Sequence, residues 1–186
     1  MDKHPFLHTE EIYDPNLEEL MEEQQHYKNK LFVFNQTAPF EKDKRENLLN
    51  EMFREFGENS YIERPLNANW GGKFVHIGKN VYANFNLTLV DDTYIYIGDN
   101  VLIGPNVVII SGNHPTSPEL RKKGLQYNQS VRIGNNVWIG SGSQILPGIE
   151  IGENSVVGAG SVVTKDIPAN VMAAGVPCKV IRELEN

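Results

Sequence analysis

One histidine of this sequence stands in a setting that suits acid–base chemistry. His114 lies in the run Gly-Asn-His-Pro at residues 112–115, where glycine, asparagine and proline are typical of a loop. An imidazole titrates at about pH 6.5, so near neutral pH it can remove a proton and later return it. His114 is therefore the first candidate for a general base. The remaining histidines, whose positions are less suggestive, are His4, His8, His26 and His76.

A catalytic histidine needs a rigid support, and the sequence that follows it predicts one. From residue 133 to residue 163 an aliphatic side chain recurs at every sixth position. This period is neither the 3.6 of a helix nor the 2 of a half-buried strand. It is typical of a hexapeptide-repeat β-helix, in which each unit of six residues forms one side of a coil. The recurring residues are Ile133, Ile139, Ile145, Ile151, Val157 and Val163.

The turn residues agree with this period. The pattern Ile-Gly-x-Asn begins at Ile77, Ile97, Ile133 and Ile151. Glycine and, less readily, asparagine tolerate positive φ, so each copy suits a corner between two short strands. The last two copies are separated by three hexapeptides, which predicts three sides for each coil and a triangular prism. The positions four residues after each aliphatic side chain are expected to fill the narrow corners, and they are Val137, Ser143, Ile149, Ser155 and Ser161.

The earlier coils can be counted from the same pattern, with two interruptions. Two extra residues near Asp91–Thr93 are expected to bulge outward at a corner. A further 24 residues separate Ile109 from Ile133, and proline, arginine and tyrosine occupy their sixth positions. Such side chains cannot fill an aliphatic stack, so residues 112–129 are predicted to leave the prism as a loop that carries His114. The first two coils are read as Ile77, Ala83, Leu89 and then Ile97, Ile103, Ile109.

Residues 1–60 read as an N-terminal helical segment, and residues 61–186 as the β-helix with its C-terminal tail. The first 15 residues are expected to form a mobile arm. A helix is predicted over residues 16–33, and a second over 41–56, ended by Gly57. The predicted fold class is mainly β: a left-handed parallel β-helix of hexapeptide repeats with an N-terminal α-helical segment and an extruded loop. The hand of the coil is inferred from the type of repeat.

Composition restricts the partners. The net charge of −7 argues against binding to nucleic acid or to an anionic membrane. No stretch approaches the roughly 20 apolar residues that span a bilayer. One cysteine, Cys178, excludes an internal disulfide framework, and the N-terminal residues lack the apolar run of a signal peptide. We therefore expect a cytoplasmic protein.

Several short segments with distinctive sequences are distributed over nearly the whole chain. They are Asn84–Asn86, Val90–Asp92, Gly112–Pro115, Glu119–Arg121, Ile133–Ser141, Gly158–Asp166 and Ala174–Cys178. Together with the helical N-terminal segment, they resemble the galactoside and maltose O-acetyltransferases. Hexapeptides alone would say little about chemistry, because this scaffold serves many functions. The loop histidine combined with the Gly-Ala-Gly-Ser and Thr-Lys-Asp stretches makes the resemblance specific.

The resemblance implies a role for several residues. His114 would be the general base that takes a proton from a sugar hydroxyl as the hydroxyl attacks the thioester of acetyl-CoA. Asn84 would contact the acceptor or the developing oxyanion. Asp14 and Asp92 would hold acceptor hydroxyls, because ionised carboxylates accept strong hydrogen bonds. Position 69, also in the acceptor site, is Asn69 here, where relatives commonly have Ser or Asp.

The resemblance also implies a groove for acetyl-CoA and an assembly. Acetyl-CoA would be the cosubstrate, with no metal required, and small residues would allow its thin pantetheine arm to lie against the coils. The expected enzyme is a homotrimer with active sites between subunits. The residues assigned to the coenzyme are Ser141, Ala159, Thr164, Lys165, Lys179 and Arg182.

Other functions are consistent with the same scaffold. A xenobiotic O-acetyltransferase, acting on an antibiotic such as chloramphenicol, shares the loop histidine and the coenzyme. A zinc enzyme of carbonic-anhydrase type needs a cluster of histidine ligands, and the coil region offers only His76 and His114. A pure scaffold would have no need of His114 or of Thr164 and Lys165. No neighbouring residue marks Cys178 as an activated nucleophile, so direct transfer in a ternary complex is expected.

Overall fold

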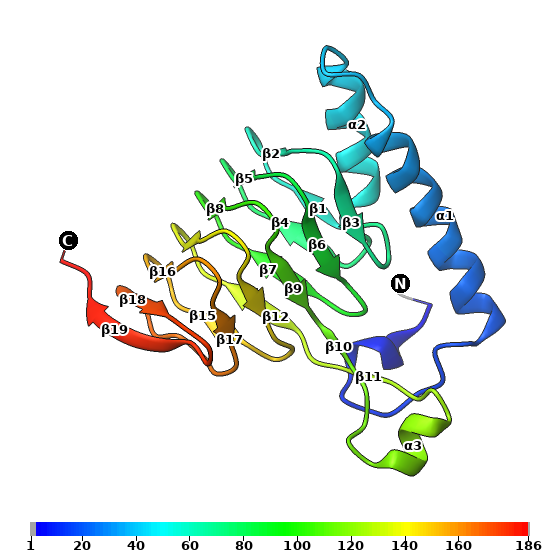
Figure 1. The fold of residues 1–186 in the computed structure, drawn as a ribbon. Coiled ribbons are helices and arrows are strands. Elements are labelled where there is room, and N and C mark those ends of the chain that lie inside the picture. The colour runs from blue at the N-terminus through cyan, green and yellow to red at the C-terminus, as the bar shows by residue number, and fades with distance from the viewer. Residues whose placement is uncertain (1–2, 186) are drawn as a thin grey trace.

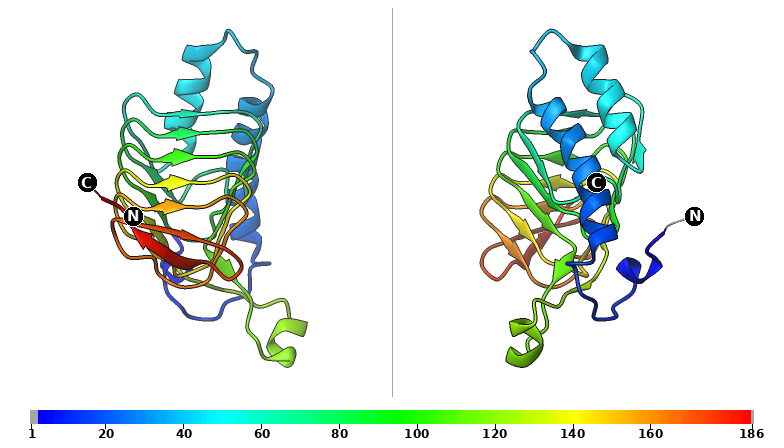
Figure 2. Two further views of the ribbon diagram at one scale, coloured as in Figure 1. Left: turned by 60° about the vertical axis from the view of Figure 1, so that its left-hand side comes forward. Right: turned by 90° about the vertical axis from the view of Figure 1, so that its right-hand side faces the viewer.

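Short parallel strands stack into three sheets in the computed structural model, which describes residues 3–185 (Figure 1). The sheets are the sides of a triangular prism, and the coils lie one above another along its length (Figure 2). The chain passes from sheet 1 to sheet 2 to sheet 3 in each coil. The mainly β, coiled architecture predicted from the six-residue period is thus confirmed.

The strands of each sheet are short and, with one exception, parallel. Sheet 1 contains β1 (Glu55–Phe56), β4 (Val75–Ile77), β7 (Ile95–Ile97), β12 (Val131–Ile133) and β15 (Glu150–Ile151). Sheet 2 contains β2 (Tyr61–Ile62), β5 (Tyr82–Ala83), β8 (Leu102–Ile103), β13 (Trp138–Ile139), β16 (Val156–Val157), β18 (Val171–Ala174) and the antiparallel β19 (Lys179–Glu183). Sheet 3 contains β3 (Leu66–Ala68), β6 (Leu87–Val90), β9 (Val108–Ile110), β14 (Gln144–Ile145) and β17 (Val162–Val163).

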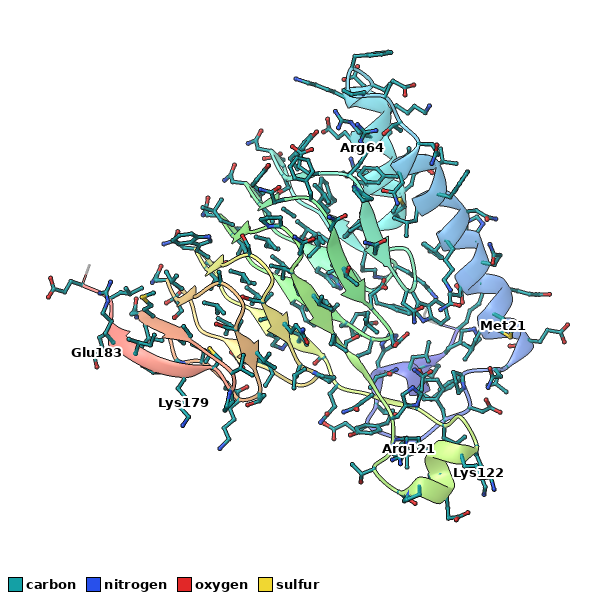
Figure 3. The ribbon with its side chains drawn as sticks, viewed as in Figure 1. Met21, Arg64, Arg121, Lys122, Lys179 and Glu183 are labelled. Atoms are coloured by element: carbon teal, nitrogen blue, oxygen red, sulfur yellow. The ribbon has the colours of Figure 1, made fainter. Side chains whose placement is uncertain are left out.

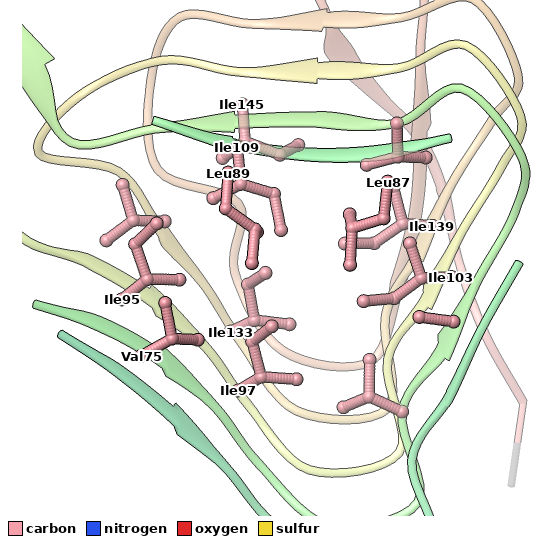
Figure 4. Packing of buried hydrophobic residues seen from close by; sticks show 14 of the residues in the cluster. Val75, Leu87, Leu89, Ile95, Ile97, Ile103, Ile109, Ile133, Ile139 and Ile145 are labelled. Carbon is pink, nitrogen blue, oxygen red and sulfur yellow. The ribbon is translucent and has the colours of Figure 1, made fainter. Parts of the chain in front are cut away.

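The predicted aliphatic stack forms the core, in the predicted register (Figure 4). Ile133 pairs with Ile97 on one side and with Ile151 on the other, and the same alignment holds in sheets 2 and 3. The small corner residues, such as Ser143 and Ser155, are also buried as expected. Each buried methylene contributes about 0.8 kcal/mol of hydrophobic stabilisation, so this continuous stack is the main source of stability.

The prism begins earlier than predicted. Phe56, Ile62 and Ala68 form an additional first coil, paired in register with Ile77, Ala83 and the next residue of the stack, Leu89. The second predicted helix, expected to continue to residue 56 and to end at Gly57, is therefore wrong at its C-terminal end. The chain leaves the helix because residue 56 has a partner in sheet 1, and this tertiary pairing outweighs helical spacing.

Two helices cover the N-terminal end of the prism (Figure 1). They are α1 (Glu18–Asn35), close to the predicted bounds, and α2 (Lys42–Met52). Leu31 and Phe34 of α1 and Leu49 of α2 join the core of the first coils. The helices therefore shield the end of the core from water.

The first residues do not form the mobile arm that was expected. A 3₁₀ turn, η1 (Pro5–His8), places Leu7 in a buried cluster with Leu20, Trp70 and Phe74. The side chain of Asn128 also donates a 2.9 Å hydrogen bond to the carbonyl of Leu7. Apolar burial and this bond order the arm against the prism; residues 1 and 2 lie outside the described part of the chain.

The three edges of the prism differ in the residues that form their turns. At the edge between sheets 1 and 2, which we call the asparagine edge, successive corner asparagines adopt φ near +60° and donate side-chain hydrogen bonds to one another. This edge is regular because each coil supplies the same turn. Its asparagines are Asn59, Asn80, Asn100, Asn136, Asn154 and Asn170.

The edge between sheets 2 and 3, which we call the glycine edge, is narrow. It contains residues 84–86, 104–107, 140–143 and 158–161. A β-carbon added to Gly140 would lie 2.5 Å from the backbone nitrogen of Ala159, so only glycine fits between neighbouring coils there. Neighbouring coils therefore approach each other closely at this edge.

All large additions to the coils occur at the third edge, between sheets 3 and 1, which we call the insertion edge. It contains residues 69–74, 91–94 and 111–130. The last addition leaves the prism as predicted, with the short strands β10 (Gly112–Asn113) and β11 (Tyr127–Asn128) at its base and α3 (Pro118–Lys122) at its tip (Figure 1). Asp91–Thr93, however, do not bulge outward: all three are buried beneath the preceding turn.

No helix within residues 3–185 is long and apolar enough to cross a membrane.

Candidate active site

His114 is held in one tautomer by a backbone carbonyl. Its Nδ1 atom lies 2.8 Å from the carbonyl oxygen of Leu125. A carbonyl can only accept a hydrogen bond, so Nδ1 carries a proton, and in the neutral imidazole Nε2 keeps its lone pair. The side chain is exposed, and the backbone N–H of His114 donates to Oδ1 of Asn113. The loop therefore presents Nε2 as a base.

The arm fastens the segment that supplies this carbonyl. Tyr13 and Gln126 form an antiparallel bridge with two backbone hydrogen bonds, of 2.8 and 3.0 Å. Gln126 directly follows Leu125, so the arm fixes the acceptor of the His114 bond. Asn128 adds a 3.1 Å bond to the carbonyl of Asp92. The histidine loop is thus tied both to the arm and to the preceding coil.

The predicted acceptor residues Asn69 and Asp92 meet at the insertion edge. Nδ2 of Asn69 donates a short hydrogen bond to Oδ1 of Asp92, and Oδ1 of Asn69 accepts a 3.3 Å bond from Gln24 of α1. Lys28 in turn donates a 3.0 Å bond to Gln24. A chain of hydrogen bonds therefore leads from α1 to the carboxylate of Asp92.

Asp92 is 3% exposed, and its environment acts on it in two directions. Burial raises the pKa of its carboxyl group, while the bond from Asn69 and the charges of His114 and Lys28 lower that pKa. A β-carbon at Gly112 would collide with this carboxylate, so glycine is needed where the histidine loop leaves the prism. Asp92 therefore lies beside Gly112, where the loop that carries His114 leaves the prism.

Asp14, also predicted to hold the acceptor, lies beside the loop because it follows Tyr13. Its carboxylate accepts hydrogen bonds from the backbone and side-chain nitrogens of Asn16, at 2.9 and 3.0 Å. The side chain is exposed. These bonds fix the local turn and leave acceptor sites on the carboxylate for a ligand.

Sequence reasoning missed Asp91. This carboxyl group is fully buried and accepts hydrogen bonds from the backbone nitrogens of Trp70 and Gly72, at 2.7 and 2.8 Å. It thereby fixes the turn that follows Asn69. Burial raises its pKa to about 7 despite these bonds. An acidic pair where the coil has extra residues marked the position, but it did not indicate that Asp91 is buried.

A groove of about 600 Å³ begins at Asn69 and Asp92 and continues between α1 and sheet 3. Its wall is formed by α1, its floor by β3 and β6, and Gln126 of the histidine loop lies at its rim. The groove contains hydrogen-bonding groups and apolar surface together, as small-molecule sites do. We call it the acceptor groove.

Asn84 does not join the other acceptor residues within one chain. It lies on the glycine edge, with its backbone N–H bonded to Ile103 and its Oδ1 accepting a 2.8 Å bond from the N–H of Phe85. Ser141 and Ala159 follow it along the same edge, both exposed. Sheet 3 separates this edge from the insertion edge.

The predicted coenzyme residues are divided in the same way. Thr164 and Lys165 are exposed at the insertion edge, after β17. Lys179 pairs with Ala174, at the end of β18 nearest the glycine edge, and lies far along the prism from the extruded loop (Figure 3). Arg182 pairs with Met172 on the same strand pair. The predicted site residues of one chain therefore lie on two different edges of the prism.

Comparison with known proteins identifies the family. Residues 8–57 match the model described as the maltose acetyltransferase hexapeptide capping motif, and residues 130–165 match the bacterial transferase hexapeptide model. Residues 94–112 match the hexapeptide repeat of succinyl-transferase. A galactoside O-acetyltransferase of Lactococcus lactis is 53% identical over 97% of this chain and 87% of its own length. This chain belongs to the galactoside and maltose O-acetyltransferase family.

Solved structures of the O-acetyltransferase family have the same fold. A galactoside acetyltransferase in complex with coenzyme A is 52% identical, with a TM-score of 0.92 and coverage of 95% of this chain and 88% of the other. A maltose O-acetyltransferase from Clostridium difficile is 41% identical, with a TM-score of 0.96 and coverage of 100% and 99%. The predicted left-handed β-helix of hexapeptide repeats is thus confirmed. The arm, α1 and α2 correspond to the capping motif.

Cys178 has no feature of a nucleophile in this O-acetyltransferase. It is buried, and burial raises the pKa of its thiol, with a smaller opposing effect from Ser161. The thiol is therefore protonated near neutral pH. Within residues 3–185, no three or more His, Cys, Asp or Glu side chains are grouped as metal ligands.

The raised pKa of Asp91 predicts a pH-dependent stability. The folded protein holds a proton at this carboxyl up to about pH 7, whereas the ordinary value is 3.8. The stabilising contribution is complete below about pH 4 and is lost as the pH rises to about 7, at a slope of at most about 1.4 kcal/mol per pH unit. We expect the Asp91→Asn variant to lose less stability than the wild type between pH 5.5 and pH 8, measured by urea unfolding. The exposed Asp14→Asn is the control, and an unchanged pH dependence in Asp91→Asn would contradict the assignment.

Proposed function

We propose that this O-acetyltransferase transfers the acetyl group of acetyl-CoA directly to a hydroxyl of a small sugar of the galactoside, maltose or glucose type. The observation that carries the proposal is His114, whose Nδ1–H is bound by the Leu125 carbonyl and whose side chain is exposed on the loop. Gln126 of the same loop lines the acceptor groove. The similarity to galactoside and maltose O-acetyltransferases over nearly the full chain supports the reaction class.

The tautomer of His114 assigns the proton transfers. Nε2 takes the proton from the acceptor hydroxyl as the oxygen attacks the thioester carbonyl carbon, forming a tetrahedral oxyanion. When the carbon–sulfur bond breaks, the imidazolium returns that proton to the leaving thiolate. Leu125 stabilises the imidazolium because its carbonyl keeps the Nδ1–H bond throughout, and an ionised Asp92 favours the same charged state.

The acceptor is held mainly at the insertion edge. Asp92 and Asp14 accept hydrogen bonds from sugar hydroxyls, and Asn69 aligns Asp92 through the bond that it donates. Because the Oδ1 atom of Asn69 already accepts a hydrogen bond from Gln24, the main role of Asn69 is to position the carboxylate of Asp92. Asn84 supplies an amide donor for the developing oxyanion, where a preformed dipole stabilises charge as it appears.

The coenzyme lies along the glycine edge in this proposal. Ser141 and Ala159 are small and exposed, so a thin pantetheine chain can lie against the coils there. Thr164 and Lys165 border the same channel from the insertion edge of a neighbouring chain. Lys179 and Arg182 lie on the strand pair that ends the prism and provide positive charge for the phosphates.

We propose a homotrimer in which a second chain completes each site. His114 and Asn84 lie on different edges of one prism, with sheet 3 between them, so one copy must bring its glycine edge to the insertion edge of the next. The outer face of sheet 2 offers a surface for such packing, because Tyr82, Leu102 and Trp138 are aligned across adjacent strands and exposed. Three copies around a threefold axis close the arrangement.

The partners are then acetyl-CoA and a small sugar. The net charge of −7 is unfavourable for nucleic acid and for anionic membranes, and we place the reaction in the cytoplasm, where acetyl-CoA is made and used.

Replacing His114 tests the base directly. We expect His114→Ala to lower kcat roughly 10²- to 10⁴-fold, because a general base contributes about that much, while coenzyme binding is kept. Thiol release from acetyl-CoA with galactosides, glucose and maltose measures the first effect, and calorimetry the second. Turnover within a few-fold of the wild type would remove His114 from the mechanism, and activity on chloramphenicol alone would move the enzyme to the xenobiotic group.

A larger side chain on the glycine edge tests the coenzyme channel. We expect Ala159→Leu to weaken acetyl-CoA binding at least about tenfold by steric obstruction, with little change in thermal unfolding. Ala169→Leu, an exposed alanine on the asparagine edge, is the matched control. Equal coenzyme affinity in the two variants, measured by calorimetry, would place the channel elsewhere.

Mixing two inactive variants tests the shared site. If His114 and Asn84 of one site come from different chains, random assembly of His114→Ala with Asn84→Ala gives intact pairs at about a quarter of the sites. We expect recovery of about a quarter of wild-type activity after the two variants are unfolded and refolded together. A mixture that stays as inactive as either variant alone would contradict a site built from two chains.

A further inference from the structure

The acceptor groove extends beyond the residues assigned to the acceptor. Asn69 and Asp92 line one end, beside Gln126. The opposite end reaches Asn35 of α1 and Leu66 of β3, which are joined by hydrogen bonds of 2.8 and 2.9 Å. A sugar held at Asp92 therefore occupies only the part of the groove nearest to the histidine loop.

The remaining length accommodates a second ring. α1 crosses sheet 3 so that Gln24 bonds Asn69 at one end, while Asn35 bonds Leu66 at the other. From Lys28 to Asn35 the helix rises about 10 Å, at 1.5 Å per residue. This distance exceeds the width of one pyranose ring, so the groove continues past a single bound sugar by about a ring.

The lining of this outer part complements a carbohydrate. Phe32 is 65% exposed and forms its wall, while Asn67 and Thr88 lie on its floor. The amide and hydroxyl of these two residues are only 3.5 Å apart, a marginal contact that leaves both able to bond a ligand. A sugar ring offers apolar C–H groups to an aromatic face and hydroxyls to polar groups. A purely apolar ligand would leave the polar groups of Asn67 and Thr88 without hydrogen-bond partners.

Phe32 is not required for the helix to pack on the prism. Leu31 and Phe34, on the buried side of α1, make that contact. Phe32 lines the groove instead and is not among the residues of the core cluster. An exposed aromatic side chain in a groove that also contains hydrogen-bonding groups is suited to a ligand.

We propose that the part of the groove formed by Phe32, Asn67 and Thr88 is a second sugar subsite, which binds the ring adjoining the one that is acetylated. The preferred acceptor is then a two-ring glycoside of the maltose type and not a monosaccharide. This inference rests on the proposed function, because it places the reacting ring at Asp92 and His114.

The test compares maltose with glucose as acceptors, at saturating acetyl-CoA. Phe32→Ala is expected to lower kcat/KM for maltose roughly 5- to 20-fold, the effect of losing one aromatic stacking partner, and to change that for glucose by less than about twofold. Phe40→Ala is the matched control, because Phe40 is an aromatic residue 85% exposed just beyond α1 and does not line the groove. It should alter neither acceptor.

The outcomes separate the subsite from the proposed function. Acetylation of both sugars with equal losses in Phe32→Ala, or with no loss, would overturn the subsite and leave the proposed function intact. Acetylation of galactosides alone by the wild-type enzyme would overturn the maltose-type subsite and leave the proposed function intact. Failure to acetylate galactosides, maltose and glucose would overturn both. A loss confined to maltose supports the second subsite.

Discussion

The six-residue register is the constraint on which the rest of this structure depends. Every coil must return each inward side chain to the position directly above its counterpart, as Ile97, Ile133 and Ile151 show. Extra residues can therefore be accommodated only at corners. In this chain the large additions all fall at one edge, so the register that builds the core also gathers Asn69, Asp92 and the His114 loop in one place. The candidate site residues therefore lie together because the stack must stay aligned.

Predictability follows from the same constraint. The aliphatic stack and the departure of residues 112–129 could be predicted because a strict period makes both a match and an interruption visible. The end of α2 was predicted wrongly because Phe56 satisfies two patterns at once, helical spacing with Met52 and Phe53 and hexapeptide spacing with Ile62. The burial of Asp91 had no local signal, since it depends on backbone donors 19 and 21 residues away in the sequence.

The site residues were recognised by resemblance, and part of their arrangement could be predicted. The coil count places Asn84 after the second side of a coil and His114 after the third, so their different edges could be predicted from the six-residue period. The triangular cross-section places sheet 3 between the two residues. Fixation of the His114 tautomer was not visible in the sequence, because it uses the backbone carbonyl of Leu125, a group that every residue type possesses.

The reversal of direction at β19 has a consequence for the molecule as a whole. A stack of parallel coils has no inherent length, because its last coil presents the same backbone edge as every coil before it and invites another chain to continue it. Here β19 folds back along β18 as an antiparallel strand and presents charged Lys179, Arg182 and Glu183. At the other end, α1 and α2 cover the first coil. Both ends of the stack are thereby covered, so the chains do not join end to end into a fibre, although the repeat itself could continue without limit.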